Sequence, residues 1–357
     1  MSSQSDVKIK IYVLYTGGTF GMAAKDQSIH QSVSACLEPL ALQELEAYLP
    51  QADKMHPGLE VVIESLAQPI DSSSIQPADW LMIAGKITEH YETFDGFVII
   101  HGTDTLAYTA SALSFIFENL TKPVVVTGSQ VPLLQPRTDA TSNYRLALTV
   151  AAHIGLSGRP MAEVAVAFAG QVMRGNRCRK MSASDWSGFQ SPNCKPLASA
   201  RRGGLRIHRH AVRRPATLNA PFALNKQLET GVIDITLFPG MTPQFLAAVL
   251  DHDNLRGVVL RTFGAGNAPE AADFLAALKH GIDKHNLTVV AVTQCPHGSV
   301  RPGHYAAGAG LAACGVLPGG DMTPEAALAK LMVLLPKIAA DGNKLLIISD
   351  LRGEMTI

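Results

Sequence analysis

The stretch DGFVIIHGTDTLAYTASALSFIFENLTKPVVVTGSQ, residues 95–130, decides which fold this chain is expected to adopt. Its two apolar runs, 95–102 and 122–130, are short and predict strands. Between them, residues 104–120 carry apolar side chains at helical spacing, which predicts a crossover helix. A strand, a helix and a strand in this order are typical of a parallel sheet that helices cover.

The same alternation extends outward from this unit. Strands are predicted at residues 7–15, about 60–66 and 163–170, and a helix is predicted over residues 79–91. The first part of the chain should therefore form the larger, N-terminal domain of an α/β protein, with a mostly parallel sheet and helices on both faces.

Residues 201–230 interrupt this rhythm. RRGGLRIHRHAVRRPATLNAP is basic, punctuated by glycine and broken by proline, and it has no helical period. We interpret it as a solvated linker or an edge hairpin at a domain boundary, because a nucleic-acid contact would interleave aromatic residues on a regular face. The expected organisation is an N-terminal domain over 1–210, a linker over 211–230 and a smaller C-terminal α/β domain over 231–357.

The C-terminal domain is predicted from a second α/β alternation. Its strands are expected at 231–240, 256–266 and 287–295, and its helices at 242–251, 269–281 and 324–335. Residues 308–313 match a dinucleotide-binding fingerprint, but no apolar strand precedes them. We therefore interpret them as a small-residue packing segment.

Composition limits the classes of partner and compartment. The 357 residues include 30 acidic and 30 basic ones, so a small neutral or zwitterionic ligand is expected rather than nucleic acid or an anionic membrane. Five cysteines without a C-x-x-C pair argue against a disulfide framework and against a zinc site. The chain has no apolar run of about 18 residues and no signal-peptide segment, so a cytoplasmic protein without a membrane partner is expected.

Polar residues gather where the predicted strands of the first domain end. The segments are TGGT (16–19), DSSS (71–74), HGTDT (101–105), TGSQ (127–130) and RGN (174–176), which leads on to Lys180. Ligands of open α/β sheets bind beyond the carboxyl ends of the strands. One such hydroxyl alone is more often a helix cap, but five polar strand ends together favour a binding site.

The reactive groups in this set are threonine hydroxyls, a lysine and a carboxylate. A threonine is a weak nucleophile at neutral pH and needs a base, either a lysine whose pKa burial has lowered or a tyrosinate. Thr103, Asp104 and Lys180 can form such a relay, and backbone N–H groups at residues 18–19 or 102–103 can form an oxyanion hole. This set predicts acyl transfer to water, as in amide hydrolysis. No metal or cofactor is expected, because the sequence lacks the metal-binding and phosphate-loop motifs.

At these residues the chain resembles the bacterial-type L-asparaginases, and most closely their cytoplasmic type I branch. The resemblance is carried by YTGGTFGM (15–22), HGTDTLAYTASALSFIFENL (101–120), TGSQVPL (127–133), FGAGNAP (263–269) and DMTPEAALAKL (321–331). It extends in the same order from about residue 8 to the last residue. It implies a two-domain α/β enzyme that hydrolyses L-asparagine to L-aspartate and ammonia without a cofactor, as a homodimer or homotetramer.

The resemblance also implies the catalytic residues. The second threonine of TGGT, Thr19, would be the nucleophile, and Thr16 would support the strand end. The threonine and aspartate of HGTD are Thr103 and Asp104, and the lysine after RGN is Lys180. These residues would activate the reacting groups.

Substrate contacts are implied at Ser72, Ser73, Asp104, Ser129 and Asn267. The serine pair after the second strand would bind the substrate carboxylate, and Asp104 would also hold the α-amino group. Asn267 belongs to a GxGN loop that enters the site from the neighbouring subunit in this family.

The chain departs from the family at the tyrosine that commonly follows TGGT and assists the nucleophile. No tyrosine occurs between Tyr15 and Tyr48, and only His30 and serines stand near the usual position. We expect Tyr305, in GHYAAGAG, to take this role, within one subunit or across a subunit boundary, and a solvated His30 not to.

A second departure concerns regulation. Some type I members bind asparagine at a separate site that uses a threonine just before the catalytic lysine, an arginine before the GxGN loop and a cysteine after TQ. Arg261 and Cys295 are present here, but Arg179 replaces the threonine. Because a bulky cation would fill or re-charge such a pocket, we expect activation by asparagine to be weakened or lost.

Other functions remain open from the sequence. One is a broader amidohydrolase that also accepts glutamine, or the ammonia-releasing subunit of a tRNA amidotransferase, which normally carries an extra N-terminal domain. Another is a catalytically weak homologue that senses an amino acid. The retained Thr19, Thr103, Asp104 and Lys180 weigh against a sensor, and the missing loop tyrosine weighs slightly for it.

Overall fold

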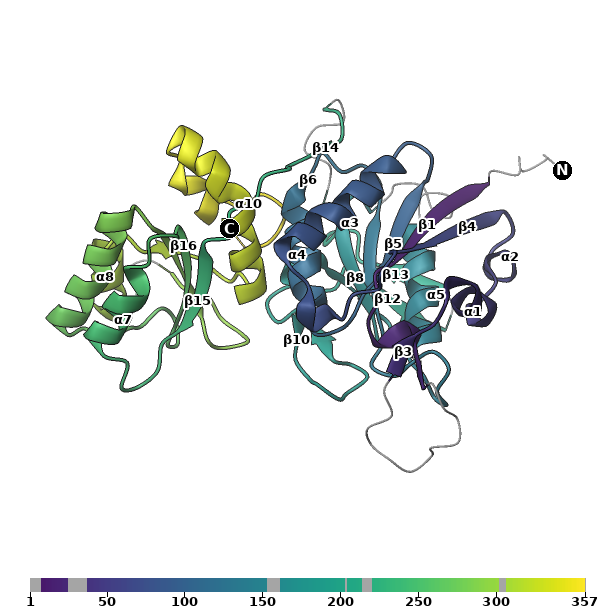
Figure 1. The fold of residues 1–357 in the computed structure, drawn as a ribbon, viewed down its shortest axis with the longest axis horizontal. Coiled ribbons are helices and arrows are strands. Elements are labelled where there is room, and N and C mark those ends of the chain that lie inside the picture. Colours follow the sequence, from purple (N-terminus) through teal and green to yellow (C-terminus); the bar gives the residue numbers. More distant parts are fainter. Residues whose placement is uncertain are drawn as a thin grey trace. The chain divides into compact units, whose positions relative to one another are not determined.

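The computed structural model describes residues 8–24, 37–152, 161–202, 204–213, 220–301 and 306–356. The chain forms two compact units (Figure 1). The first contains Met1–Ser191 and Lys195–Leu224, and the second contains Pro192–Cys194 and Asn225–Ile357. Each unit has its own sheet and helices, which confirms the predicted α/β class with a larger N-terminal and a smaller C-terminal part.

Five parallel strands form the centre of the first sheet. In spatial order they are β4 (Leu59–Ser65), β1 (Ile9–Tyr15), β5 (Gly96–Ile100), β7 (Val124–Thr127) and β8 (Val164–Phe168). The chain passes from β1 to β4 on one side and then returns to β5 on the other side of β1. The strand order therefore reverses between β1 and β5, and such a switch point is where open α/β sheets bind ligands.

Helices bury both faces of this sheet. Helices α3 (Pro77–Glu89) and α4 (Leu106–Ile116) cover one face, while α1 (Leu42–Tyr48) and α5 (Ala140–Ala151) cover the other (Figure 1). All five residues of β5 and of β8 are buried. This double burial explains why the central strands have continuous apolar runs instead of an alternating pattern.

The fifth parallel strand is followed by an antiparallel one. Ala169 and Gly170 both have positive φ, 47° and 75°, and they form a tight turn into β9 (Gln171–Arg174). Because β9 runs back along β8, Arg174 lies beside Ala165, near the amino end of β8. The expectation that RGN stands at a carboxyl strand end was therefore wrong, because the positive-φ turn reverses the chain. Arg174 instead contacts the buried Glu163 carboxylate at 2.5 Å.

The basic segment adds an edge hairpin to the sheet. Strand β12 (Ala198–Arg201) pairs with β9 and with β13 (Gly204–Ile207), both in antiparallel orientation. Helix α4 is shorter than predicted because residues Phe117–Glu118 leave it to form β6, which pairs with β14 (Ala223–Leu224).

Short elements complete the first unit. They are β2 (Met22–Ala24), β3 (Leu37–Pro39), α2 (Ala52–Met55), β10 (Arg179–Lys180) and β11 (Phe189–Gln190). Strands β10 and β11 form a hairpin that positions Lys180.

The second unit is a four-stranded parallel sheet with helices. Its strands lie in chain order as β15 (Val232–Thr236), β16 (Gly257–Thr262), β17 (Thr288–Thr293) and β18 (Leu317–Pro318). Its helices are α7 (Pro243–Leu250), α8 (Ala272–His285), α9 (Ala306–Ala313) and α10 (Pro324–Asp341). The segment that matched the dinucleotide fingerprint forms most of α9, and a Cβ at its Gly310 would lie 3.0 Å from Leu275 Cδ1. No helix in the described ranges is long and apolar enough to span a membrane.

A buried ion pair attaches the C-terminal segment to α10. Lys330 Nζ lies 2.6 Å from Glu354 Oε1, and both side chains have 0% exposure. Lys330 also donates to the Ser349 carbonyl at 2.5 Å, and Glu354 accepts the backbone N–H groups of Leu351 and Arg352. Every charge in this pair is therefore matched by hydrogen bonds, as a buried pair requires.

Removing one partner of this pair should be costly. We expect Lys330→Met to lower the free energy of unfolding by about 3–5 kcal/mol, because the Glu354 carboxylate stays buried without its cation. Lys337→Met, at an exposed position of the same helix, should change it by less than about 0.5 kcal/mol. Urea unfolding followed by circular dichroism measures both, and equal small losses would contradict a stabilising role for the pair.

Candidate active site

Glycines allow the turns after three strands, β1, β4 and β5, to pack closely together at the switch point. After β1, Gly17 and Gly18 have φ of 122° and 85°, a region that favours glycine. A Cβ on Gly18 would lie closer than 3.0 Å to the Gly102 backbone, and a Cβ on Gly102 would lie equally close to the Ser72 side chain. The turns after β1, β5 and β4 are thus in direct contact. The glycines are needed because no Cβ fits between these segments.

This contact brings Thr19 to the switch point. Thr19 begins a short 3-10 helix, Thr19–Gly21, directly after Gly18. Its neighbour Phe20 is fully buried near Tyr144 of α5, with 6.4 Å between the ring centroids. Thr19 itself is half-buried, whereas the residues on both sides of it are buried. The motif is therefore anchored in the core and leaves the Thr19 side chain partly accessible.

Other hydroxyls of the strand ends hold neighbouring turns together. Thr16 Oγ1 donates to the Ile100 carbonyl at 3.0 Å, which joins the ends of β1 and β5. Thr105 Oγ1 donates to the Ser72 carbonyl at 2.7 Å, which joins the turns after β5 and β4. Part of the polarity at the strand ends is therefore structural.

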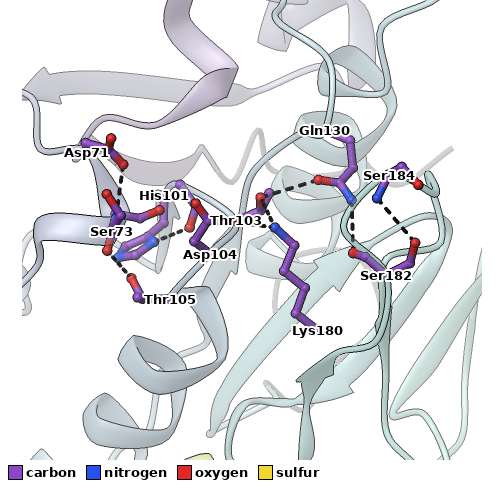
Figure 2. Close-up of polar contacts among 12 residues, drawn as sticks. Asp71, Ser73, His101, Thr103, Asp104, Thr105, Gln130, Lys180, Ser182 and Ser184 are labelled. Atoms are coloured by element: carbon purple, nitrogen blue, oxygen red, sulfur yellow. Dashed lines mark hydrogen bonds and ion pairs between the residues drawn. The ribbon is translucent and has the colours of Figure 1, made fainter.

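Thr103, Asp104 and Lys180 form one hydrogen-bonded group (Figure 2). Lys180 Nζ lies 2.9 Å from Thr103 Oγ1 and 2.7 Å from Asp104 Oδ1. Thr103 is buried, the Lys180 side chain is 20% exposed and the Asp104 side chain is 62% exposed. The group therefore extends from the interior to solvent. It brings together a hydroxyl, an amine and a carboxylate that are up to 77 residues apart in the sequence.

His101 is a buried neighbour whose role the sequence did not reveal. Its Nδ1 lies 2.7 Å from the Gly102 carbonyl, and its Nε2 lies 3.0 Å from Thr109 Oγ1, which also accepts the Trp80 indole N–H. Burial lowers the pKa of His101 to about 4, and the Gly102 carbonyl opposes this effect. The imidazole is therefore neutral near pH 7. It orients the Gly102 carbonyl in the turn that carries Thr103.

Asp139 stabilises the turn after β7 through hydrogen bonds to its backbone. Its carboxylate accepts the backbone N–H groups of Gln130 and Val131 at 3.0–3.1 Å, and it accepts the Asn143 amide at 3.0 Å. Asn143 also donates to the Gly128 carbonyl. Asp139 is buried, so these donors compensate its charge. The fixed turn places Gln130 beside Thr103, with 3.3 Å between Gln130 Oε1 and Thr103 Oγ1.

The serines predicted to bind substrate differ in exposure. Ser72 is buried and Ser73 is exposed, and the Ser73 N–H donates to Asp71 Oδ1 at 3.0 Å. Ser129 is fully buried, and its hydroxyl has no hydrogen-bond partner within the described ranges. Both Ser72 and Ser73 come after β4, as their place in the sequence suggested, and Ser72 lies against Gly102 at the switch point.

The remaining predicted site residues belong to the second unit or are not described. Asn267 follows β16 and exchanges backbone hydrogen bonds with Phe263. Tyr305 and His30 lie outside the described residues. The residues that the structure describes contain no group of three or more His, Cys, Asp or Glu side chains that could hold a metal ion.

The structure also describes the three residues that stand at the positions of the regulatory site of some type I members. Arg261 of β16 forms an ion pair with Asp234 of β15, with both Asp234 oxygens 2.8 Å from Arg261 Nε. Arg179 lies next to Lys180 on β10, and Cys295 is exposed after β17. The expected loss of regulation stays a prediction.

Comparisons with known proteins identify relatives over the whole chain. A family model described as "Asparaginase, N-terminal" matches residues 10–213, and one described as "Glutaminase/Asparaginase C-terminal domain" matches residues 232–344. L-asparaginase 1 of Escherichia coli strain K12 is 40% identical over 358 aligned residues, which cover 98% of either chain.

Solved structures of L-asparaginases are also similar to this chain over nearly its whole length. The crystal structure of L-asparaginase I from Vibrio cholerae has a TM-score of 0.84 and 39% identity, and covers 98% of this chain and 100% of its own. The thermostable L-asparaginase from Thermococcus kodakarensis has a TM-score of 0.85 and 32% identity over the same shares.

The buried His101 should make stability depend on pH. Its folded pKa, about 4, lies below the ordinary value of 6.5, so the stability it contributes is complete above pH 6.5 and declines as the pH falls toward 4. By pH 5 the loss should reach about 2 kcal/mol. His101→Asn, which keeps a donor for the Gly102 carbonyl, should start less stable at pH 7 but lose less on acidification.

Urea midpoints at pH 7 and pH 5 test this expectation. His280→Asn, at an exposed position of α8, is the matched control and should keep the acid sensitivity of the wild type. If His101→Asn lost as much stability as the wild type between these pH values, the buried neutral imidazole would not be the cause.

Proposed function

The chain belongs to the asparaginase family, and from this membership we propose that it hydrolyses L-asparagine to L-aspartate and ammonia. The family models span both units, and L-asparaginase 1 of Escherichia coli and L-asparaginase I of Vibrio cholerae carry this activity in their names. The observation that carries the proposal is the Thr103–Asp104–Lys180 group beside the glycine turn of Thr19, at the switch point of the sheet.

Thr19 is the nucleophile in the proposed reaction. Its Oγ1 attacks the side-chain carbonyl carbon of asparagine, and the threonine proton passes through a base to the departing nitrogen, which leaves as ammonia. A water molecule then attacks the resulting ester and releases aspartate, while Thr19 regains its proton. The partial exposure of Thr19 between buried neighbours supports this role, because a small substrate can reach it.

Thr103, Asp104 and Lys180 form the proton relay. The Asp104 carboxylate holds the Lys180 amine beside Thr103, so a proton can move between the amine and the hydroxyl over 2.9 Å. Backbone N–H groups of the glycine turns would stabilise the oxyanion that forms on the substrate carbonyl. Because these turns are in contact, the donors stay in place during the reaction.

Substrate binding uses residues on both sides of the relay. Ser72 and Ser73 bind the α-carboxylate, Asp104 binds the α-ammonium group, and the buried Ser129 hydroxyl offers a further polar contact. Asn267 enters from a neighbouring subunit, so the proposed enzyme is a homodimer or a homotetramer. We also propose a cytoplasmic location, which the resemblance of the sequence to the type I branch supports.

Glutamine is the second substrate to test. The description of the family model that matches the C-terminal part names both glutaminase and asparaginase. This description favours a broader amidohydrolase as the alternative function. A catalytically weak sensor would bind either amino acid without releasing ammonia.

Ammonia release from asparagine and glutamine tests the proposal. We expect the wild type to hydrolyse asparagine and Thr19→Ala to lose kcat by about a thousandfold or more, because the nucleophile is gone. Lys180→Met should lose about a hundredfold or more, because the relay has no base. Thr19→Ser, which keeps a hydroxyl, is the matched control and should retain part of the rate. If the wild-type protein bound asparagine but released no ammonia, the proposal of an enzyme would be wrong and the sensor hypothesis would be favoured.

Tyr305 is the proposed replacement for the missing loop tyrosine. Tyr305→Phe removes only the phenolic hydroxyl, so we expect kcat to fall by about a hundredfold while the fold is kept. His30→Ala should leave kcat close to that of the wild type. Steady-state rates of both variants decide between the two candidates: a wild-type kcat in Tyr305→Phe together with an inactive His30→Ala would assign the role to His30.

A further inference from the structure

Gln130 contacts the relay but has no part in the proposed reaction so far. Its carboxamide lies between Thr103 and the loop that joins β10 to β11 (Figure 2). Gln130 Oε1 is 3.3 Å from Thr103 Oγ1, while Gln130 Nε2 is 3.0 Å from the Asp185 carbonyl and 3.5 Å from the Ser182 carbonyl. One side chain thus connects the relay to a surface loop.

The chemistry of these partners fixes the direction of each hydrogen bond. Carbonyl oxygens only accept, so the NH₂ group of Gln130 must face the loop and its oxygen must face Thr103. The amide oxygen also only accepts, so Thr103 must donate its proton to Gln130. The lone pairs of Thr103 are then left for Lys180, whose Nζ donates at 2.9 Å.

We propose that Gln130 is a positioning residue that sets the direction of the Thr103 hydroxyl in the relay. This inference rests on the proposed function and adds to it a residue that acts through Thr103. With Gln130 in place, the Thr103 proton points to Gln130 and the Thr103 lone pairs face Lys180, so the relay has one defined arrangement of its protons before substrate arrives.

The loop is built to hold the Gln130 amide. Its two ends are joined because the backbone N–H groups of Met181 and Ser182 donate to the Gly188 carbonyl at 2.7 and 3.3 Å. Inside the loop, Ser182 Oγ accepts the N–H groups of Ser184 and Asp185 at 3.3 and 3.0 Å. These bonds point the Ser182 and Asp185 carbonyls at Gln130. The loop therefore offers a preformed acceptor pair.

Gly188 makes room for this arrangement. It is buried although the loop before it is exposed. A Cβ at this position would lie 2.7 Å from Gln130 Nε2, 3.1 Å from the Asp185 carbonyl and 3.2 Å from the Ser182 carbonyl. The carboxamide is the end of a flexible side chain, so it would move before the backbone does. Gly188→Ala therefore displaces Gln130 from a distance, without changing a relay residue.

Two substitutions of Gln130 have opposite expected effects on Lys180. In Gln130→Met the Thr103 proton is released and can be donated to a neutral Lys180 amine, which favours the neutral form of the amine. In Gln130→Glu a carboxylate is added near the ammonium group, which favours the charged form of Lys180. A residue that only filled space would not produce shifts of opposite sign.

Kinetics give the first test. We expect Gln130→Met and Gly188→Ala each to lower kcat for asparagine by about tenfold to a hundredfold. The KM should change by less than about threefold, because Gln130 is not a proposed substrate contact and binding before the transition state is untouched. Ser187→Ala, at the exposed position beside Gly188, is the matched control and should behave as the wild type. Unchanged kcat in both Gln130→Met and Gly188→Ala would overturn the proposal while asparagine hydrolysis by the wild type stands.

A second test does not depend on turnover. The pH dependence of Lys180 acetylation by acetic anhydride, followed by mass spectrometry, reports how readily the Lys180 amine reacts in each full-length variant. The expected order of the midpoints is Gln130→Met and Gly188→Ala below the wild type, and Gln130→Glu above it. Identical midpoints in all four proteins would overturn the proposal even if the wild type released no ammonia, so the two failures are separable. Gly188→Ala keeps the test decisive if Gln130→Met does not fold.

Discussion

The close contact between the Gly18 and Gly102 backbones is the constraint on which the rest of the site depends. Both glycines follow adjacent strands, β1 and β5, at the point where the strand order reverses. No side chain fits between the two turns, because a Cβ at Gly18 would lie closer than 3.0 Å to Gly102. The contact brings Thr19 and Thr103 to the same region of the sheet edge. The positions of both threonines are fixed by buried residues close to them in the sequence. Phe20 follows Thr19, His101 lies two residues before Thr103, and both Phe20 and His101 are buried.

Hydrogen-bond direction is the second organising principle of the site. Asp139 fixes the turn that carries Gln130, Gln130 accepts from Thr103, and Lys180 donates to Thr103 and to Asp104. The Asp139 and Asp104 carboxylates and the Gln130 amide oxygen can only accept, and the Lys180 ammonium group can only donate. The Thr103 hydroxyl can do both, but these partners leave it one arrangement, so the protons have assigned places before a substrate binds. Such preorganisation is what a relay contributes to catalysis. It also explains why an exposed loop is built with internal hydrogen bonds beside the site.

The sequence predicted the fold class and the elements of the parallel core because burial leaves continuous apolar runs and helical periodicity in the chain. It was wrong where a turn decided the geometry. The positive φ of Ala169 and Gly170 reverses the chain after β8 and moves RGN to the other end of the sheet. The helix predicted over 104–120 ends at Ile116, since the following residues pair with a distant strand, β14. Neither event has a periodic signal.

The reactive residues can be recognised from the chain alone: they are the TGGT and HGTDT motifs and a lysine that resembles the catalytic lysine of one family. Which of these residues are in contact depends on how the chain folds. Thr16 donates to Ile100 and Thr105 donates to Ser72, so they join strand ends, although they have the same chemistry as Thr103. The neutral state of His101 and the contact of Gln130 with Thr103 also required the structure. The reason is physical: a hydroxyl, an imidazole or a carboxamide takes its role from the partners and the burial around it, and those come from segments that are distant in the sequence.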